Sequence, residues 1–575
     1  MTISNGGQKT KLIKLIILGI CVAVSVKVLF VGFSADEEYH LVLCYRLAHG
    51  DTLLSEVWDT LQTSAFYGQL LIWIYMKLFH TVTGSLIFLR LCGILTQAAV
   101  AGFLHSTLKK HIEARKALVI SAAFFCTYTK LLAMPEFSNL QTWAIVLMVC
   151  CLWRAKDAYD ESQTGRVTML IVAAALALCV AVLSSACVIL VPIVIVMQAI
   201  LFKGSGVKKN FLFFGTCAAV AFVYLGTIIA INGFGRTMAG ISGILAGDDT
   251  HLGENLLTGY SKVASYLKDL GAVALWVVGT GALAFAVYMI IRAVTGNNSS
   301  LWMYIWIAEA FAVTLFNWLV RKTGYEGLKL YIPVILAIGI TEFVRKSRED
   351  GARDVIVPFF GMILGIGLFV NVLLFSNVDL ITNLTFINTS VLWGLVIIAI
   401  RSEQKKIDGN VQTILATFFL VMAVGTALTL NSGPYGTTVF NIPDLNYMRK
   451  GPAKGAFVSR TIEAVYDTNT ELFMNTVREG SNVLIVTNFI HNQSLSTLYM
   501  LNNVNISHYT VNSTPTYGDK LYEYWGAHPD KWPDAVIINS GSCAYEDYLW
   551  ALDFLGNQEG WEEYSLYDVQ YYIKK

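Results

Sequence analysis

The chain has 575 residues, of which 55% are hydrophobic and only 14% are charged, and its mean hydropathy is +0.56. Soluble globular proteins carry roughly 25% charged residues, so this composition excludes an ordinary soluble protein and favours one that lies mostly within a lipid bilayer. The formal net charge of +1 argues against a nucleic-acid-binding protein, because such proteins present a strongly basic surface.

Apolar stretches of the kind that cross a bilayer follow one another along most of the chain. The first, Leu12–Phe33, lacks the short core and the small-residue cleavage site of a signal peptide, so we expect it to remain as a membrane anchor. The thirteen predicted spans lie near residues 12–33, 84–107, 117–133, 140–153, 167–185, 186–202, 210–232, 270–291, 301–319, 328–343, 355–376, 389–400 and 411–430. Because thirteen is odd, the two ends of the chain are expected on opposite sides of the membrane.

The Lys and Arg residues between the predicted spans indicate the orientation, because cytoplasmic loops are enriched in both residue types. If the N-terminus is cytoplasmic, the inner segments carry most of these residues, and the alternation between basic inner loops and less basic outer loops continues along the chain. The sequence therefore predicts a multi-pass protein of the cell membrane with a cytoplasmic N-terminus. The segment that begins at Asn431 is then extracytoplasmic.

The long first outer loop, residues 32–83, contains a second apolar stretch, Phe66–Phe79. This stretch is too short for a span and predicts a helix that lies in the membrane interface.

The pattern changes again after residue 430. Two short apolar runs, Asn482–Asn488 and Asp534–Asn539, predict buried strands, and helices are expected near 455–479, 515–526 and 543–555. Alternating strands and helices indicate an α/β domain. The predicted fold is thus a polytopic α-helical membrane domain, residues 1–430, followed by a soluble extracytoplasmic α/β domain, residues 431–575.

Acidic residues lie beside two of the predicted spans, where they are costly unless they face water or have a function. Asp36, Glu37 and Glu38 directly follow the first span, and Glu136 lies in a tight outer turn after the third span, close to Lys130. Three adjacent carboxylates could equally be a solvated helix end, and a single Lys could extend to the lipid headgroups. Together these residues could bind an acceptor hydroxyl and a phosphate, with a carboxylate as general base.

The order of these residues resembles the GT-C superfamily of membrane glycosyltransferases, and within it the protein O-mannosyltransferase and aminoarabinose transferase group (glycosyltransferase family 39-like). The matching features are Asp36-Glu37 after the first span, Gly50-Asp51 in the long loop, the interfacial helix, Arg90 at the start of the second span, Glu136 in the outer turn and the Lys329-Leu330-Tyr331-Ile332-Pro333 pattern before a later span. The sequence departs from the group in two places. The Pro-Pro pair that often begins the interfacial helix is replaced by Ser64-Ala65-Phe66-Tyr67-Gly68, and the second acid is Glu rather than the commoner Asp.

The resemblance implies that the first outer loop is catalytic and that a sugar moves from a polyprenyl phosphate to a polysaccharide, glycolipid or protein of the cell envelope. Asp36 would be the base, with Glu37 or Glu136 positioning it, and Asp36 and Glu136 could hold a divalent cation such as Mg, Mn or Zn. The departing lipid phosphate requires nearby cations, and the residues implied in binding the lipid phosphate or the sugar are Arg90, Lys130, Arg321, Lys322, Lys329 and Tyr331. Each of these cations could equally face lipid headgroups.

Two other readings remain open. A transporter or flippase of lipid-linked saccharides would show internal repeats and charged residues at mid-membrane depth, whereas these charges gather at the outer surface. A binding or assembly subunit with the same fold would have lost both Asp36 and Glu136, and both are present.

Overall fold

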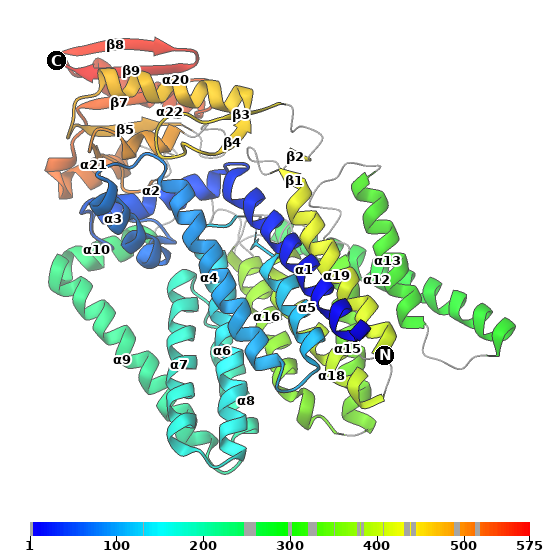
Figure 1. The fold of residues 1–575 in the computed structure, drawn as a ribbon. Helices are drawn as coiled ribbons and strands as arrows, with labels where there is room; N and C mark the ends of the chain where they lie inside the picture. The colour runs from blue at the N-terminus through cyan, green and yellow to red at the C-terminus, as the bar shows by residue number, and fades with distance from the viewer. Residues whose placement is uncertain are drawn as a thin grey trace.

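The structure, a computed structural model, consists of a bundle of long helices with a smaller α/β region at one end (Figure 1). It describes residues 4–129, 132–245, 260–296, 302–319, 331–349, 351–375, 380, 384–405, 408–430, 437–438, 444–487, 495–511 and 518–575.

A described helix overlaps each predicted span, although several helices begin or end at other residues than predicted. These helices are α1 (Ser4–Phe30), α4 (Ser85–Leu108), α5 (Ala114–Phe125), α6 (Phe137–Asp160), α7 (Thr164–Ser184), α8 (Leu190–Leu201), α9 (Gly206–Asn232), α12 (Tyr260–Thr295), α13 (Trp302–Leu319), α15 (Tyr331–Glu349), α16 (Ile356–Phe375), α18 (Asn388–Lys405) and α19 (Asp408–Leu428). Among the described helices, α1, α4, α7, α9, α12 and α16 are long and apolar enough to cross a membrane, and α8, α13 and α19 contain shorter apolar stretches. The chain is therefore a multi-pass membrane protein.

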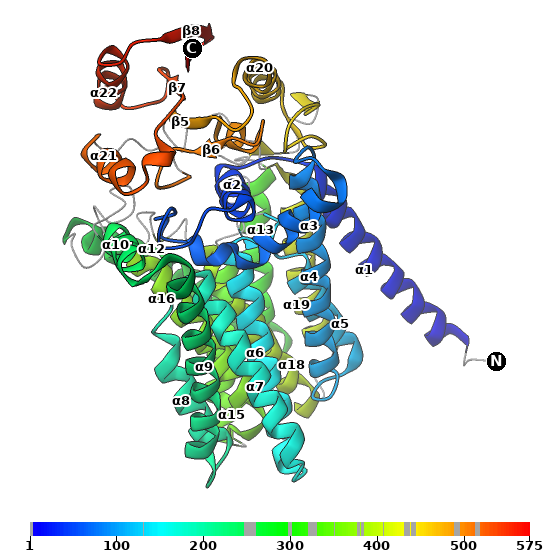
Figure 2. The same cartoon turned by 90° about the vertical axis from the view of Figure 1, so that its left-hand side faces the viewer.

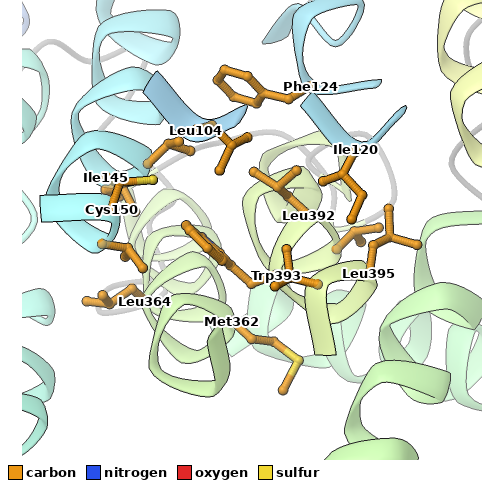
Figure 3. Packing of buried hydrophobic residues seen from close by; sticks show 14 of the residues in the cluster. Leu104, Ile120, Phe124, Ile145, Cys150, Met362, Leu364, Leu392, Trp393 and Leu395 are labelled. Atoms are coloured by element: carbon orange, nitrogen blue, oxygen red, sulfur yellow. The ribbon is translucent and has the colours of Figure 1, made fainter. Parts of the chain in front are cut away.

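Helix α18 lies in the interior of the bundle and packs against α15 and α16. Its fully buried Trp393 lies among apolar side chains from neighbouring helices, as Figure 3 shows. Glycines allow these helices to approach closely. A Cβ atom on Gly361 would lie 2.7 Å from the Trp393 ring, and one on Gly339 would lie 2.8 Å from the Cα atom of Gly394.

Several of the predicted inner loops meet at one end of the bundle, which we call the loop end. Ion pairs and hydrogen bonds join them: His111 with Asp157 (3.2 Å), Arg353 with Asp160 (3.7 Å), Tyr159 with Lys203 (3.0 Å) and Lys116 with Ser402 (3.0 Å). These contacts place the segments that follow α4, α6, α8, α15 and α18 at the same end of the bundle.

The opposite end, the domain end, holds the first long loop and the C-terminal region (Figures 1 and 2). The first loop forms α2 (Ala35–His49), a short 3₁₀ turn (Gln62–Ala65) and α3 (Phe66–Phe79), so the predicted interfacial helix is confirmed as a helix with the same bounds. Helix α10 (Phe234–Leu245) also lies there, and the Asn232 amide before it donates to the carbonyl of Leu53 at 2.6 Å.

A mixed five-stranded sheet forms the C-terminal region. Its strands are β5 (Asn482–Val486), β6 (Asn505–Ile506), β7 (Ala535–Asn539), β8 (Trp561–Leu566) and β9 (Val569–Lys574), in the order β6-β5-β7-β9-β8. β5 is parallel to β6 and β7, whereas β9 is antiparallel to β7 and β8. The two predicted strands are confirmed as β5 and β7, and the predicted helices correspond to α20 (Arg460–Thr476), α21 (Gly518–Ala527) and α22 (Tyr545–Gly556).

The two faces of the sheet are covered by different helices, because successive side chains of a strand point to opposite faces. Val483 and Ile485 of β5 belong to a cluster that includes Phe473 of α20. Leu484 and Val486 belong to a second cluster, which contains residues of α21 and α22. The first cluster continues into α2 and α3, so the C-terminal sheet and the first loop share one apolar core.

Two short antiparallel pairs precede this sheet, β1 (Thr429–Leu430) with β2 (Thr437–Thr438) and β3 (Leu445–Tyr447) with β4 (Phe457–Ser459). The second pair contacts the end of α1, because Gly32 donates a backbone hydrogen bond to Phe457 at 2.8 Å.

Candidate active site

The three adjacent carboxylates begin a helix of their own rather than ending the first span. Ser34 is the N-cap of α2, and its hydroxyl accepts a hydrogen bond from the backbone of Glu37 at 3.3 Å. Asp36, Glu37 and Glu38 therefore occupy the first turn of α2. Negative charge is favoured there, because the N-terminus of a helix carries a partial positive charge.

Glu37 forms a buried, two-point ion pair with Arg90 of α4. The Nε atom of Arg90 donates to Oε1 of Glu37 at 2.8 Å, and Nη2 donates to Oε2 at 2.5 Å. The same guanidinium donates to the carbonyls of Leu29 and Gly32 at 3.1 and 2.6 Å. Since Arg90 and Glu37 are only 2% and 1% exposed, this pair fastens the end of α1 to α2 and α4, and the guanidinium is turned towards the protein interior.

Glu38 is also buried, and its carboxylate accepts a hydrogen bond from the backbone of Thr497 in the C-terminal region at 3.3 Å. Asp36 differs from its two neighbours in being only half-buried. Among the three carboxylates, Asp36 is the most exposed.

Glu136 is fully buried at the N-cap of α6. Its carboxylate accepts hydrogen bonds from the backbone of Ser138 at 2.9 Å and of Asn139 at 2.7 Å, and also from the Ser138 hydroxyl. The Asn139 amide in turn donates to the carbonyls of Leu132 and Met134 at 2.7 and 2.9 Å. Glu136 therefore shapes the turn before α6 as well as carrying a charge.

Helix α4 brings the Glu136 turn close to the start of α2. One turn beyond Arg90, a Cβ atom on Gly93 would lie 1.8 Å from the carbonyl oxygen of Ala133 and 3.1 Å from the Cα atom of Met134. The same part of α4 thus binds Glu37 with the side chain of Arg90 and contacts the turn that ends at Glu136. The two acidic positions indicated by the sequence lie at the same end of the bundle, on adjacent elements.

This close approach predicts a sharp difference between two glycines of α4. Gly93→Ala should destabilise the protein by about 2 kcal/mol or more, because a methyl group would overlap the backbone of the turn. Gly102→Ala should be neutral or stabilising by up to ~1 kcal/mol, because nothing lies within 4 Å of its Cβ position. Denaturant unfolding of both variants in detergent checks this. Equal stabilities would mean that α4 does not touch the turn.

His40, one turn after Asp36 on α2, was not singled out by the sequence. It is fully buried, next to Gly68 of α3 and the carbonyl of Pro135. A histidine four residues after an acid at a helix start is the signal that could have indicated it, since positions i and i+4 share a helix face. His40 therefore lies between the helix of Asp36 and the turn that precedes Glu136.

Burial lowers the pKa of His40 from 6.5 to about 4, and the nearby Pro135 carbonyl opposes this shift. Because the unfolded chain then binds a proton that the folded protein excludes, stability should be unaffected above pH 6.5 and decline as the pH falls from 6.5 towards 4, by about 3 kcal/mol in total. His40→Leu should flatten this part of the stability profile, whereas His80→Asn, at an exposed position, should not. An unchanged profile in His40→Leu would contradict the assignment.

Several residues indicated by the sequence are not brought into this site by described contacts. Lys130, Arg321, Lys322 and Lys329 lie outside the described residues. Tyr331 is the first residue of α15 and is fully buried, with its ring 6.1 Å from that of Phe418 in α19. Within the described part of the chain, no three His, Cys, Asp or Glu side chains are grouped to hold a metal ion, and we derive no step from one.

No protein-family model and no curated protein sequence matches the chain. Several solved structures resemble it. ArnT from Cupriavidus metallidurans in the apo state is 13% identical, with 98% of each chain covered and a TM-score of 0.49, and ArnT bound to undecaprenyl phosphate gives 97% of each chain and a TM-score of 0.46. The Archaeoglobus fulgidus oligosaccharyltransferase in complex with Zn and sulfate is 10% identical over 97% of this chain and 73% of that chain, with a TM-score of 0.47. These neighbours are GT-C-fold glycosyltransferases.

Proposed function

We propose that the protein is a membrane glycosyltransferase that moves a sugar from a polyprenyl phosphate to a cell-envelope acceptor, with Asp36 as the general base. The observation that carries the proposal is the difference in burial among four carboxylates at the domain end. Glu37 is paired with Arg90, Glu38 with the backbone of Thr497, and Glu136 caps α6. Asp36 differs from these three buried side chains in being half-buried, and it lies on the helix whose His40 is next to the carbonyl of Pro135.

In the proposed reaction, the acceptor hydroxyl oxygen bonds to the anomeric carbon of the donor sugar while the bond from that carbon to the phosphate oxygen breaks. The hydroxyl proton passes to the Asp36 carboxylate, and the polyprenyl phosphate departs with the electron pair. The ion pair of Glu37 and Arg90 joins α2 to α4, and Glu136 caps α6. We therefore assign Arg90 to positioning these helices rather than to binding the lipid phosphate. Lys130, Arg321, Lys322 and Lys329 are the proposed partners of the departing phosphate.

The proposal includes the topology: thirteen spans, a cytoplasmic N-terminus and an extracytoplasmic C-terminal domain. The support is that the loops rich in Lys and Arg meet at the loop end, whereas Asp36 and Glu136 lie at the domain end. Catalysis would then take place on the outer face, where a lipid carries the sugar.

A donor screen tests this function. Purified full-length protein is incubated with a panel of polyprenyl-phosphate-linked sugars and a cell-envelope extract as acceptor, and free polyprenyl phosphate is measured. We expect release with one donor class, together with transfer of the sugar to the extract. If no donor is cleaved but a labelled donor crosses the bilayer of vesicles containing the protein, the protein is a transporter of lipid-linked saccharides and not a glycosyltransferase.

A further inference from the structure

A buried ionic cluster joins the far end of α2 to the C-terminal region. The Nε atom of Arg46, in the last turn of α2, donates to one carboxylate oxygen of Asp51 at 2.5 Å. Lys531 donates to the other oxygen of Asp51 at 2.5 Å and lies 3.3 Å from the carboxylate of Glu56. Asp51 thus bridges a cation of the first loop and a cation that is 480 residues later in the chain.

The cluster is shielded from water and held by further hydrogen bonds. Arg46 and Lys531 are buried, and Arg46 also donates to the carbonyl of Glu56 at 2.8 Å and to the Tyr524 hydroxyl at 3.1 Å. The two cations hold the pKa of Asp51 below its usual value, although burial alone would raise it. Buried charges are tolerated only with well-formed partners, so this cluster fixes the position of the loop relative to the C-terminal region.

Other contacts extend the same junction along the first loop. The backbone N–H of Trp58 donates to the carbonyl of Tyr509 at 2.8 Å, and the backbone N–H of Val511 donates to the carboxylate of Asp59 at 3.2 Å. At the other end of α2, Glu38 accepts from Thr497. The C-terminal region therefore holds α2 near both of its ends, and Asp36 lies on this helix.

We propose that the C-terminal region positions the catalytic helix, and that Lys531 is a positioning residue that acts through Asp51 on the orientation of α2. This inference rests on the proposed function of Asp36 as base. Lys531 does not bind substrate in this view. Without its charge, the remaining pair of Asp51 and Arg46 is free to shift, and a displacement of about 1 Å at a reacting group can lower turnover about 100-fold.

Three variants of the full-length protein test the proposal. Lys531→Met should lower kcat about 10- to 100-fold with the KM for the lipid donor changed less than about threefold. Lys531→Arg should retain most of the activity, because it keeps the charge. Lys450→Met removes an exposed ion pair with Glu471 in the same region and should leave kcat unchanged.

Hydrogen–deuterium exchange separates positioning from general unfolding. In Lys531→Met, exchange should rise in peptides of α2 and residues 50–60 but not in β5 and β7. Wild-type kcat with unchanged α2 exchange would overturn the proposal, and so would increased exchange throughout the sheet together with an equal loss in Lys531→Arg. The exchange result stands apart from the chemistry, so it distinguishes a failure of this inference from a failure of Asp36 as the base.

Discussion

Replacing Asp36 by Asn is expected to lower kcat by about 10²- to 10⁴-fold, the range that general-base catalysis contributes. The amide keeps the size and the hydrogen-bonding capacity of the side chain but cannot take a proton from the acceptor hydroxyl. Expression, membrane insertion and unfolding temperature should remain those of the wild type, because Asp36 is only half-buried. Release of polyprenyl phosphate under saturating donor measures the effect.

Glu38→Gln is the matched control for this variant. It removes a negative charge from the same helical turn while keeping an oxygen that can accept the hydrogen bond from Thr497. We expect its turnover to remain within about tenfold of the wild type, a loss smaller than that of most general-base substitutions. If Asp36→Asn turns over at a near-normal rate, or if Glu38→Gln is the more damaging change, Asp36 is not the base.

Arg90→Met is expected to destabilise the protein by about 3–5 kcal/mol, because it leaves Glu37 as an unpaired buried charge. It also removes the donors to Leu29 and Gly32. Combining it with Glu37→Leu should recover part of this loss, since the unpaired charge is then absent. Denaturant unfolding in detergent, monitored by tryptophan fluorescence, gives the free energies.

An exposed ion pair provides the comparison for this prediction. Lys156 and Asp160 pair at 2.5 Å on the surface of α6, and Lys156→Met should cost less than about 1 kcal/mol. A similar small loss in Arg90→Met would show that the guanidinium does not join α1, α2 and α4, and the proposed positioning of Asp36 would lose its support.

The long apolar helices could be predicted from the sequence because bilayer-spanning segments have a strong compositional signal. The interfacial helix α3 was predicted with its observed bounds for the same reason. Helix α2 was not, although the spacing of Ser34 and Glu37 is that of a capping box. In the structure, the Glu37 side chain bonds to Arg90 instead of returning to its own helix end.

The strands β8 and β9 also went unpredicted. The alternating buried residues Val569, Tyr571 and Ile573 are the period-two signal of β9, whereas most of β8 is exposed and carries little apolar pattern. The sequence could predict that Asp36 and Glu136 lie at the same end of the bundle, but not that helix α4 contacts both of the segments that carry them. That depends on Gly93 and on the partner of Arg90, which are long-range contacts with no local signature.

The same limit applies to the contacts between the first loop and the C-terminal region. Lys531 is one of many charged residues in the tail, and nothing in its neighbouring sequence indicates that its partner is Asp51. A buried ion pair between distant segments is defined by the fold alone.

Chemical labelling at position 36 shows whether this side chain faces the outside of the cell and lies where the lipid donor binds. Asp36→Cys, in a background where Cys543 is replaced by Ser, is exposed to a membrane-impermeant maleimide in intact spheroplasts and in the purified protein. We expect labelling from outside the cell, and we expect a polyprenyl-phosphate-linked sugar that the wild type cleaves to protect the purified protein. Labelling only after the membrane is permeabilised, or labelling that a cleavable donor does not slow, would contradict this expectation.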